Sequence, residues 1–323
     1  MDIKARSNII GHKNEIDFLT TLYVNKKLPS SLMFLGPSGI GKRLVAINYA
    51  KMINCSSDTN KPCNTCQNCI KIENNLSPDF YIIKPEEKKN VIRIDEARNI
   101  KKQSSASIYE SAYRIFIIDD AQKMNFQTQN ALLKTLEEPI GNNLFILISD
   151  SLTGIFDTIV SRCYVVKFMP LAISDVSNHL INNCKMNKET SNFLAKYTGG
   201  KIGEAIRLVR TDLLARRSEI INVLTKRSRI NNFPEVNLSA KGMIRDDIKF
   251  MLSWFRDLLL VKTGQREEFI INIDRMAEIE NCAKWYTVSD FYKIINDLIS
   301  YEDYIDYNVN SKIIRDNLMT IVK

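Results

Sequence analysis

A glycine-rich run with the spacing of a phosphate-binding loop lies near the amino-terminal end of the chain. Residues 36–42, GPSGIGK, match the pattern G-x-x-x-x-G-K. The apolar run Leu32–Leu35 before it predicts a buried strand, and residues 42–54 after it predict a helix. The glycines let backbone N–H groups converge on a phosphate, and the helix dipole and Lys42 add positive charge. The candidate phosphate ligands are Gly36, Gly39, Gly41 and Lys42. The alternative is a glycine-rich turn that arose by chance.

The position after Lys42 departs from working loops of this kind. A working loop carries Ser or Thr there, because the hydroxyl holds the magnesium ion. Arg43 stands at this position, offers no acceptor to a metal and brings its own positive charge. We therefore expect a phosphate cradle without its metal ligand, and we do not expect ATP with Mg²⁺ to be a working cofactor of this chain's own site.

Two acids follow a second apolar run and complete the same candidate site. Residues 114–118 predict a strand, and Asp119 at its end is placed to reach a metal directly or through water. Active ATPases of this type carry Glu next, to orient the attacking water, whereas Asp120 is one methylene shorter. The alternative is that Asp119 and Asp120 only cap the strand.

Four cysteines with metal-ligand spacing lie between these two parts. Cys55, Cys63, Cys66 and Cys69 form the pattern C-x7-C-x2-C-x2-C. Four thiolates within fifteen residues predict a tetrahedral zinc site, and coordination by all four leaves no open position, so the zinc should be structural. An iron–sulfur centre is the second metal hypothesis, and free surface thiols are the alternative without a metal.

The length and composition of the chain limit its number of domains and its broad class of protein. The chain has 323 residues, which suggests two or three domains. Hydrophobic residues make up 45% and charged residues 25%, which excludes a wholly disordered chain. The net charge of +8 allows an anionic partner without naming one. No apolar stretch approaches the roughly 18 residues of a membrane span, and no secretory signal begins the chain. We therefore expect a cytoplasmic protein with reduced cysteines and no membrane partner.

The two halves of the chain differ in their predicted elements. Short apolar strands alternate with helices as far as about residue 167, which predicts an α/β fold with a parallel sheet and helices on its faces. The predicted strands are 32–35, 81–83, 114–118, 144–148 and 164–166, and a helix is predicted at 127–138. The second half predicts only helices, at 174–184, 187–197, 201–210, 246–262 and 288–300. The apolar stripes of the last two, spaced as on one helix face, predict core positions.

Several stretches together resemble the AAA+ subunits of the bacterial DNA polymerase III clamp loader. The resemblance covers nearly the whole chain and is strongest over residues 30–166. The matching stretches are Ile9–His12, Gly36–Arg43, Ser77–Phe80, Asn130–Pro139, the Ser-Arg-Cys motif in Thr158–Cys163, and Asn308–Asn310. It implies an AAA+ domain over 1–167 with a zinc module at about 55–69, a helical lid domain over 168–210, and a helical collar for oligomerisation over 211–323.

The resemblance also implies roles for single residues. In such rings the arginine of Ser-Arg-Cys reaches ATP on the neighbouring subunit, so Arg162 is the implied arginine finger, and its guanidinium fork suits phosphate oxygens. The alternative is a plain surface arginine. Ser149 stands near the first sensor position, where the following Asp150 adds negative charge in place of phosphate. Gly203 stands at the second sensor position, where the family has an arginine.

These features together predict a stator, a subunit that completes a neighbour's ATP site and hydrolyses little or no ATP itself. The resemblance implies partners in a hetero-oligomeric ring, namely gamma/tau-type ATPase subunits and a delta subunit. Through that complex the partners include the sliding clamp and primer–template DNA. One alternative is an active AAA+ motor subunit, which has to accommodate Arg43, Asp120 and Gly203. Another is a zinc-bearing nucleic-acid-binding protein, although residues 55–69 contain only one basic residue, Lys61.

Overall fold

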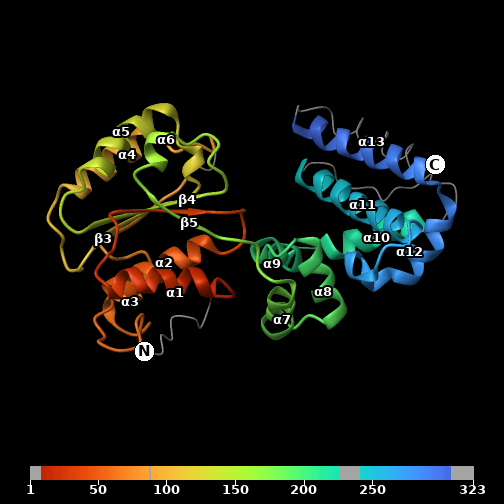
Figure 1. The fold of residues 1–323 in the computed structure, drawn as a ribbon, viewed down its shortest axis with the longest axis horizontal. Coiled ribbons are helices and arrows are strands. Elements are labelled where there is room, and N and C mark those ends of the chain that lie inside the picture. Colours follow the sequence, from red (N-terminus) through yellow and green to blue (C-terminus); the bar gives the residue numbers. More distant parts are fainter. Residues whose placement is uncertain (1–8, 87–88, 212, 226–240, 307–323) are drawn as a thin grey trace. The chain divides into compact units, whose positions relative to one another are not determined.

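The computed structural model describes residues 9–86, 89–211, 213–225 and 241–306, which form two compact units (Figure 1). The first unit consists of the chain up to Asp175 together with Gly200–Gly203. The second unit consists of Val176–Gly199 and the chain from Glu204 onward. Among the described residues, none of the helices combines the length and apolar character needed to cross a bilayer.

A five-stranded parallel sheet forms the centre of the first unit. Its strands are β1 (Ser31–Leu35), β2 (Phe80–Ile83), β3 (Arg114–Ile118), β4 (Asn143–Ser149) and β5 (Tyr164–Lys167). The spatial order is β2-β3-β4-β1-β5, and every neighbouring pair is parallel. All residues of β3 and β4 are buried, as expected of a parallel sheet that is covered on both faces. The predicted parallel α/β fold is confirmed.

Helices cover the two faces of this sheet (Figure 1). One face packs against α1 (Lys13–Val24), α2 (Lys42–Asn54) and α3 (Gln67–Glu73), and the other against α4 (Ile94–Ser104), α5 (Phe126–Glu137) and α6 (Asp157–Val160). Successive strand residues alternate between the faces, so Phe34 joins the α2 side and Met33 joins the α5 side. A short 3₁₀ turn, η2 (Ala121–Lys123), follows β3.

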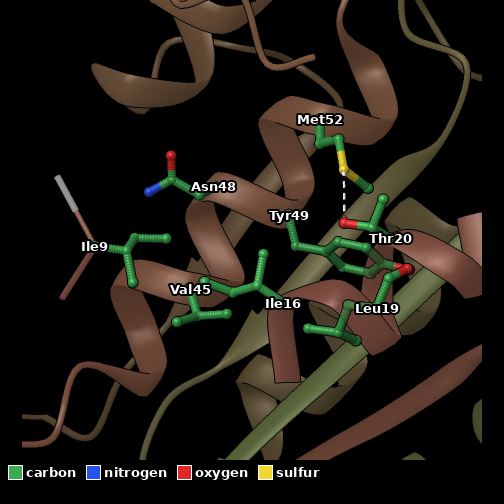
Figure 2. A pocket seen from close by; sticks show the side chains of 8 residues that line it. All are labelled: Ile9, Ile16, Leu19, Thr20, Val45, Asn48, Tyr49 and Met52. Carbon is green, nitrogen blue, oxygen red and sulfur yellow. Dashed lines mark hydrogen bonds between the residues drawn. The ribbon is translucent and has the colours of Figure 1, made fainter. Parts of the chain in front are cut away.

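Contacts between α1 and α2 fix the helix that begins at the phosphate loop (Figure 2). The Tyr49 hydroxyl donates to the Leu19 carbonyl oxygen at 3.0 Å, and the Thr20 hydroxyl donates to the Met52 sulfur at 3.8 Å. The pocket between these helices has about 20 Å³ of free volume, room for a single water molecule. The two helices therefore pack closely at this point, and their hydrogen bonds tie α2 to α1 behind the loop.

A buried ion pair joins β2 to β3 at the start of both strands. Asp79 and Arg114 are fully buried, and the Arg114 NH2 nitrogen lies 2.9 Å from Asp79 Oδ1. Asp79 also accepts from the backbone N–H groups of Tyr109, Glu110 and Ser111. Burial acts to raise the pKa of Asp79, but these amides and Arg114 outweigh it and hold the pKa below its usual value. The matching stretch Ser77–Phe80 is thus a structural anchor for the loop that leads into β3.

The second unit contains only helices in its described residues. They are α7 (Ile173–Cys184), α8 (Lys188–Tyr197), α9 (Ile202–Arg210), α10 (Leu213–Thr225), α11 (Lys241–Lys262), α12 (Met276–Cys282) and α13 (Val288–Asp306), with 3₁₀ turns η3 (Glu267–Phe269), η4 (Ile273–Arg275) and η5 (Ala283–Trp285). The first residues of α7 and α9 belong to the first unit. The predicted stripes are core: Met251 and Phe255 of α11 and Phe291 and Leu298 of α13 are buried.

The division into three domains stays a prediction, since the structure separates two units. The stretch Asn308–Asn310 lies outside the described residues.

Candidate functional site

The predicted phosphate ligands Gly36, Gly39, Gly41 and Lys42 lie in one loop at the carboxyl end of β1. A β-carbon on Gly36 would lie 2.1 Å from the Phe168 carbonyl oxygen, so only glycine fits there. Gly39 and Gly41 have φ angles of 78° and 103°, in the region that favours glycine. The loop therefore has the backbone of a phosphate cradle that opens onto the first turn of α2.

The Lys42 side chain is turned into the protein. It is 5% exposed, donates to the carbonyl oxygens of Gly36 and Pro37, and lies 3.1 Å from Asp150 Oδ1. These three acceptors match the three donors of an ammonium group. The charge of Lys42 is therefore balanced within the chain, and Asp150 places a negative charge where it would repel a phosphate.

The remaining charged residues of the loop are also paired. Arg43 NH1 lies 3.3 Å from Asp119 Oδ2, so the predicted metal ligand faces a guanidinium. The Asp120 carboxylate lies 2.8 Å from Lys123 Nζ. A magnesium ion at this place would have to compete with Arg43 for Asp119 and would find no hydroxyl ligand at position 43. These residues do not fit ATP with Mg²⁺.

Both predicted sensor positions adjoin this loop. Ser149 is fully buried, and its hydroxyl lies 2.9 Å from Gln122 Oε1 and 2.6 Å from the Ser151 carbonyl oxygen. The Gly203 N–H donates to the Gly39 carbonyl oxygen at 2.7 Å, and a β-carbon at Gly203 would lie 3.1 Å from that oxygen. The start of α9 therefore closes directly onto the phosphate loop, with no space for a larger side chain unless the loop shifts.

Arg162 lies at the opposite end of the sheet, between α6 and β5. In the parallel register Leu32 pairs with Tyr164 and Leu35 pairs with Lys167. Arg162 thus precedes the amino end of β5, whereas the phosphate loop follows the carboxyl end of β1. The four residues of β5 lie between Arg162 and the level of the phosphate loop, and they span roughly 13 Å along the strand. The Arg162 side chain is 34% exposed, and its NH2 nitrogen lies 2.5 Å from Glu137 Oε1.

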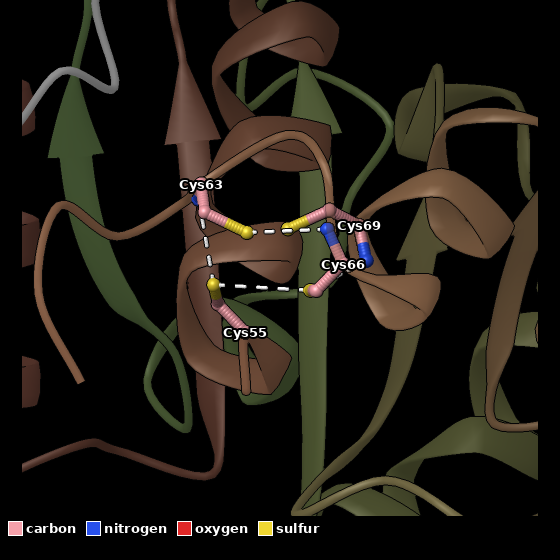
Figure 3. Close-up of side chains that lie close together, drawn as sticks. All are labelled: Cys55, Cys63, Cys66 and Cys69. Atoms are coloured by element: carbon pink, nitrogen blue, oxygen red, sulfur yellow. Dashed lines mark hydrogen bonds between the residues drawn. The ribbon is translucent and has the colours of Figure 1, made fainter. Parts of the chain in front are cut away.

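The four cysteines come together beside α2 and α3 (Figure 3). Their sulfur atoms all lie within 4.8 Å of one another, and all four thiols are free of disulfides. Four bonds of about 2.3 Å to a tetrahedral zinc would set the sulfurs about 3.8 Å apart. The observed spacing, including 4.0 Å between Cys55 and Cys66, is close to this value. The cluster fits a metal ion.

The backbone around the cluster supports thiolate ligands. The N–H groups of Cys63, Cys66 and Cys69 point at the sulfurs of Cys55, Cys63 and Cys66 at 3.4, 3.3 and 3.5 Å. The last of these hydrogen bonds, from the Cys69 N–H to the Cys66 sulfur, caps the start of α3. Burial acts to raise the pKa of Cys66, but hydrogen bonds from Ser56 and the Cys69 amide outweigh it and lower the pKa to about 5. Burial raises the pKa of Cys69, which a bound cation would reverse.

The sequence reasoning missed the partners of the candidate residues. It named Asp150 as a negative charge near the phosphate position but not its pairing with Lys42, and it assigned nothing to Glu137. Two signals pointed to Glu137: it lies within the matching stretch Asn130–Pro139, and it is an acid at the end of a helix, where the helix dipole disfavours negative charge.

Sequence comparisons cover both units. The family model for "DNA polymerase III, delta subunit" matches residues 11–172, and that for "DNA polymerase III, delta subunit, C terminal" matches residues 211–322. The DNA polymerase III subunit delta' of Bacillus subtilis is 25% identical over 92% of each chain. The delta' subunit of Pseudomonas aeruginosa is 33% identical over 41% of this chain and 40% of its own.

A DNA polymerase III subunit gamma from Buchnera aphidicola is 28% identical over 76% of this chain and 68% of its own. Among solved structures, a gamma subunit-related protein of Thermotoga maritima has a TM-score of 0.48 and 19% identity over 94% of this chain and 98% of its own. Since the first family model alone matches half of the chain, this protein belongs to the DNA polymerase III delta subunit family.

Proposed function

We propose that this protein is a delta'-type stator of a bacterial clamp loader, which completes the ATP site of a neighbouring subunit and has no working ATP site of its own. The observation that carries the proposal is the internal pairing of the phosphate loop. Lys42 is engaged by Asp150 and Arg43 by Asp119. The lysine that a nucleotide would need is thus already neutralised by the chain, and the carboxylate that would reach the metal is paired with an arginine.

The position of Arg162 supports a role in trans. The side chain stands at the other end of the sheet from the chain's own loop, beyond the reach of an arginine. An arginine supplied in trans to a phosphoryl-transfer site stabilises the charge of the transition state. Partially exposed and held by Glu137, Arg162 is available to a phosphate on a second subunit.

The partners follow from this role and from the names of the relatives. They are gamma/tau-type ATPase subunits and a delta subunit in a hetero-oligomeric ring, and through that ring the sliding clamp and primed DNA. Because such a complex would act on primed DNA, we expect the protein in the bacterial cytoplasm.

Zinc is the proposed occupant of the cysteine cluster. Cys55, Cys63, Cys66 and Cys69 supply four sulfur ligands at near-tetrahedral spacing, which suits zinc and leaves no open position for catalysis. The ion would join the end of α2 to α3, so its role is structural.

The purified chain alone tests whether its own site works. We expect no magnesium-dependent ATP turnover above the background of a Lys42→Ala variant, and no saturable binding of Mg²⁺-ATP in calorimetry. Turnover by the isolated chain that is lost in Lys42→Ala would support the active-motor alternative and overturn the stator proposal.

A further inference from the structure

We propose that Glu137 is the positioning residue of the arginine finger: it holds the Arg162 guanidinium in the orientation in which a neighbour's phosphate meets it. The inference rests on the proposed trans role of Arg162. It concerns a residue that does not itself touch the nucleotide.

Two anchors fix the guanidinium. The NH2 nitrogen lies 2.5 Å from Glu137 Oε1, and NH1 donates to the Thr158 carbonyl oxygen at 2.7 Å. Glu137 belongs to α5 and Thr158 to α6, so the anchors come from different helices. Contacts at both terminal nitrogens favour one orientation of the guanidinium before any partner arrives.

Glu137 stands at an unfavourable place for an acid. It is the last residue of α5, where the negative end of the helix dipole disfavours a carboxylate. Glu138 follows Glu137 and is also exposed. Of these two acids, only Glu137 forms an ion pair with Arg162 within the described part of the chain. The guanidinium compensates the unfavourable position, and the acid in return directs the guanidinium.

The anchors leave donors for a phosphate. Among the described residues, the hydrogen bonds of the guanidinium come from NH1, to the Thr158 carbonyl oxygen and more distantly to the Ser161 hydroxyl at 3.4 Å, while NH2 forms the ion pair with Glu137. The Nε and NH2 nitrogens therefore keep N–H donors that an outside acceptor can use. The guanidinium is thus contacted by two helices without being buried, since the Arg162 side chain is 34% exposed.

The test uses the complete clamp loader reconstituted with variants of this chain, with DNA- and clamp-stimulated ATP turnover as the readout. We expect Glu137→Ala to lower kcat roughly 10-fold with little change in KM for ATP, because a displaced finger weakens the transition state and not the bound substrate. Glu137→Gln keeps an oxygen acceptor at the same reach and should recover most of the loss. Glu138→Ala removes the same charge from the neighbouring position and should leave turnover unchanged.

A double-mutant cycle separates positioning from general damage. In the Arg162→Ala background, Glu137→Ala should cause no further loss, since the group through which it acts is gone. An equal loss in both backgrounds, or a gain in turnover with Glu137→Ala alone, would overturn the inference. If Arg162→Ala itself leaves turnover unchanged, the trans role fails first, and the two failures are thereby distinguished.

Discussion

Arg162→Ala is expected to abolish most ATP turnover at the site that this chain completes, in a clamp loader that still assembles. Removal of an arginine finger from comparable phosphoryl-transfer sites costs about 10³–10⁵ in rate. The ion pair with Glu137 is partly exposed, and such pairs contribute at most about 1 kcal/mol to stability, so the variant should fold and join the ring. The total ATP turnover of the complex should fall by the fraction that this site, together with any site coupled to it, contributes.

The measurement is steady-state phosphate release by the reconstituted complex in the presence of clamp and primed DNA, with assembly checked by size-exclusion chromatography. Arg162→Lys keeps the charge but lacks the guanidinium fork, so we expect it to recover only a part of the lost rate. Arg266→Ala is a matched control, because Arg266 also has an exposed ion pair, with Glu268. Unchanged turnover in a fully assembled Arg162→Ala complex would sink the proposed role.

Loss of the metal from the cysteine cluster is expected to have the second large effect, on stability. Structural zinc sites supply about 10–16 kcal/mol in isolated peptides, and Cys55 and Cys69 are buried here against the end of α2. We therefore expect the protein to hold about one zinc per chain. Chelation under denaturant-free conditions, or Cys66→Ser, should lower the free energy of unfolding by several kcal/mol.

Metal content by mass spectrometry and thermal unfolding on the same samples check this expectation. Cys184→Ser removes a partly buried thiol outside the cluster and should change neither quantity. Full stability and metal content in Cys66→Ser would show that the cluster is not a four-thiolate site. Iron with visible absorbance in place of zinc would favour the iron–sulfur hypothesis.

Elements with a strong local signal could be predicted from the sequence. The buried runs before Gly36 and Asp119 gave two strands of the parallel sheet within a residue of their observed bounds, and the stripes of α11 and α13 gave their core faces. By contrast, α4 was not predicted, because Ala97 and Ile100 are its only buried apolar residues among many charges. The seven-residue α3 was also missed, since its start depends on a cap by the Cys66 sulfur.

The pairings that define the site could not be predicted in the same way. Lys42 and Asp150 are 108 residues apart, and Arg43 and Asp119 are 76 apart, so only the order of strands in the sheet brings them together. The residue types at positions 43 and 203, arginine and glycine, already argued against a working ATP site. What the sequence could not reveal was that the acids of the site neutralise its own cations.

The claim that this chain serves a neighbour's ATP site and not its own is tested most directly by one comparison in the reconstituted complex. Lys42→Met alters only the chain's own loop and keeps most of the buried methylenes, whereas Arg162→Ala alters only the finger. We predict that ATP turnover with Lys42→Met equals that of the unmodified complex, while turnover with Arg162→Ala falls by the share of the completed site and of any site coupled to it. A loss with Lys42→Met as large as that with Arg162→Ala would contradict the stator role and identify a working ATP site in this chain.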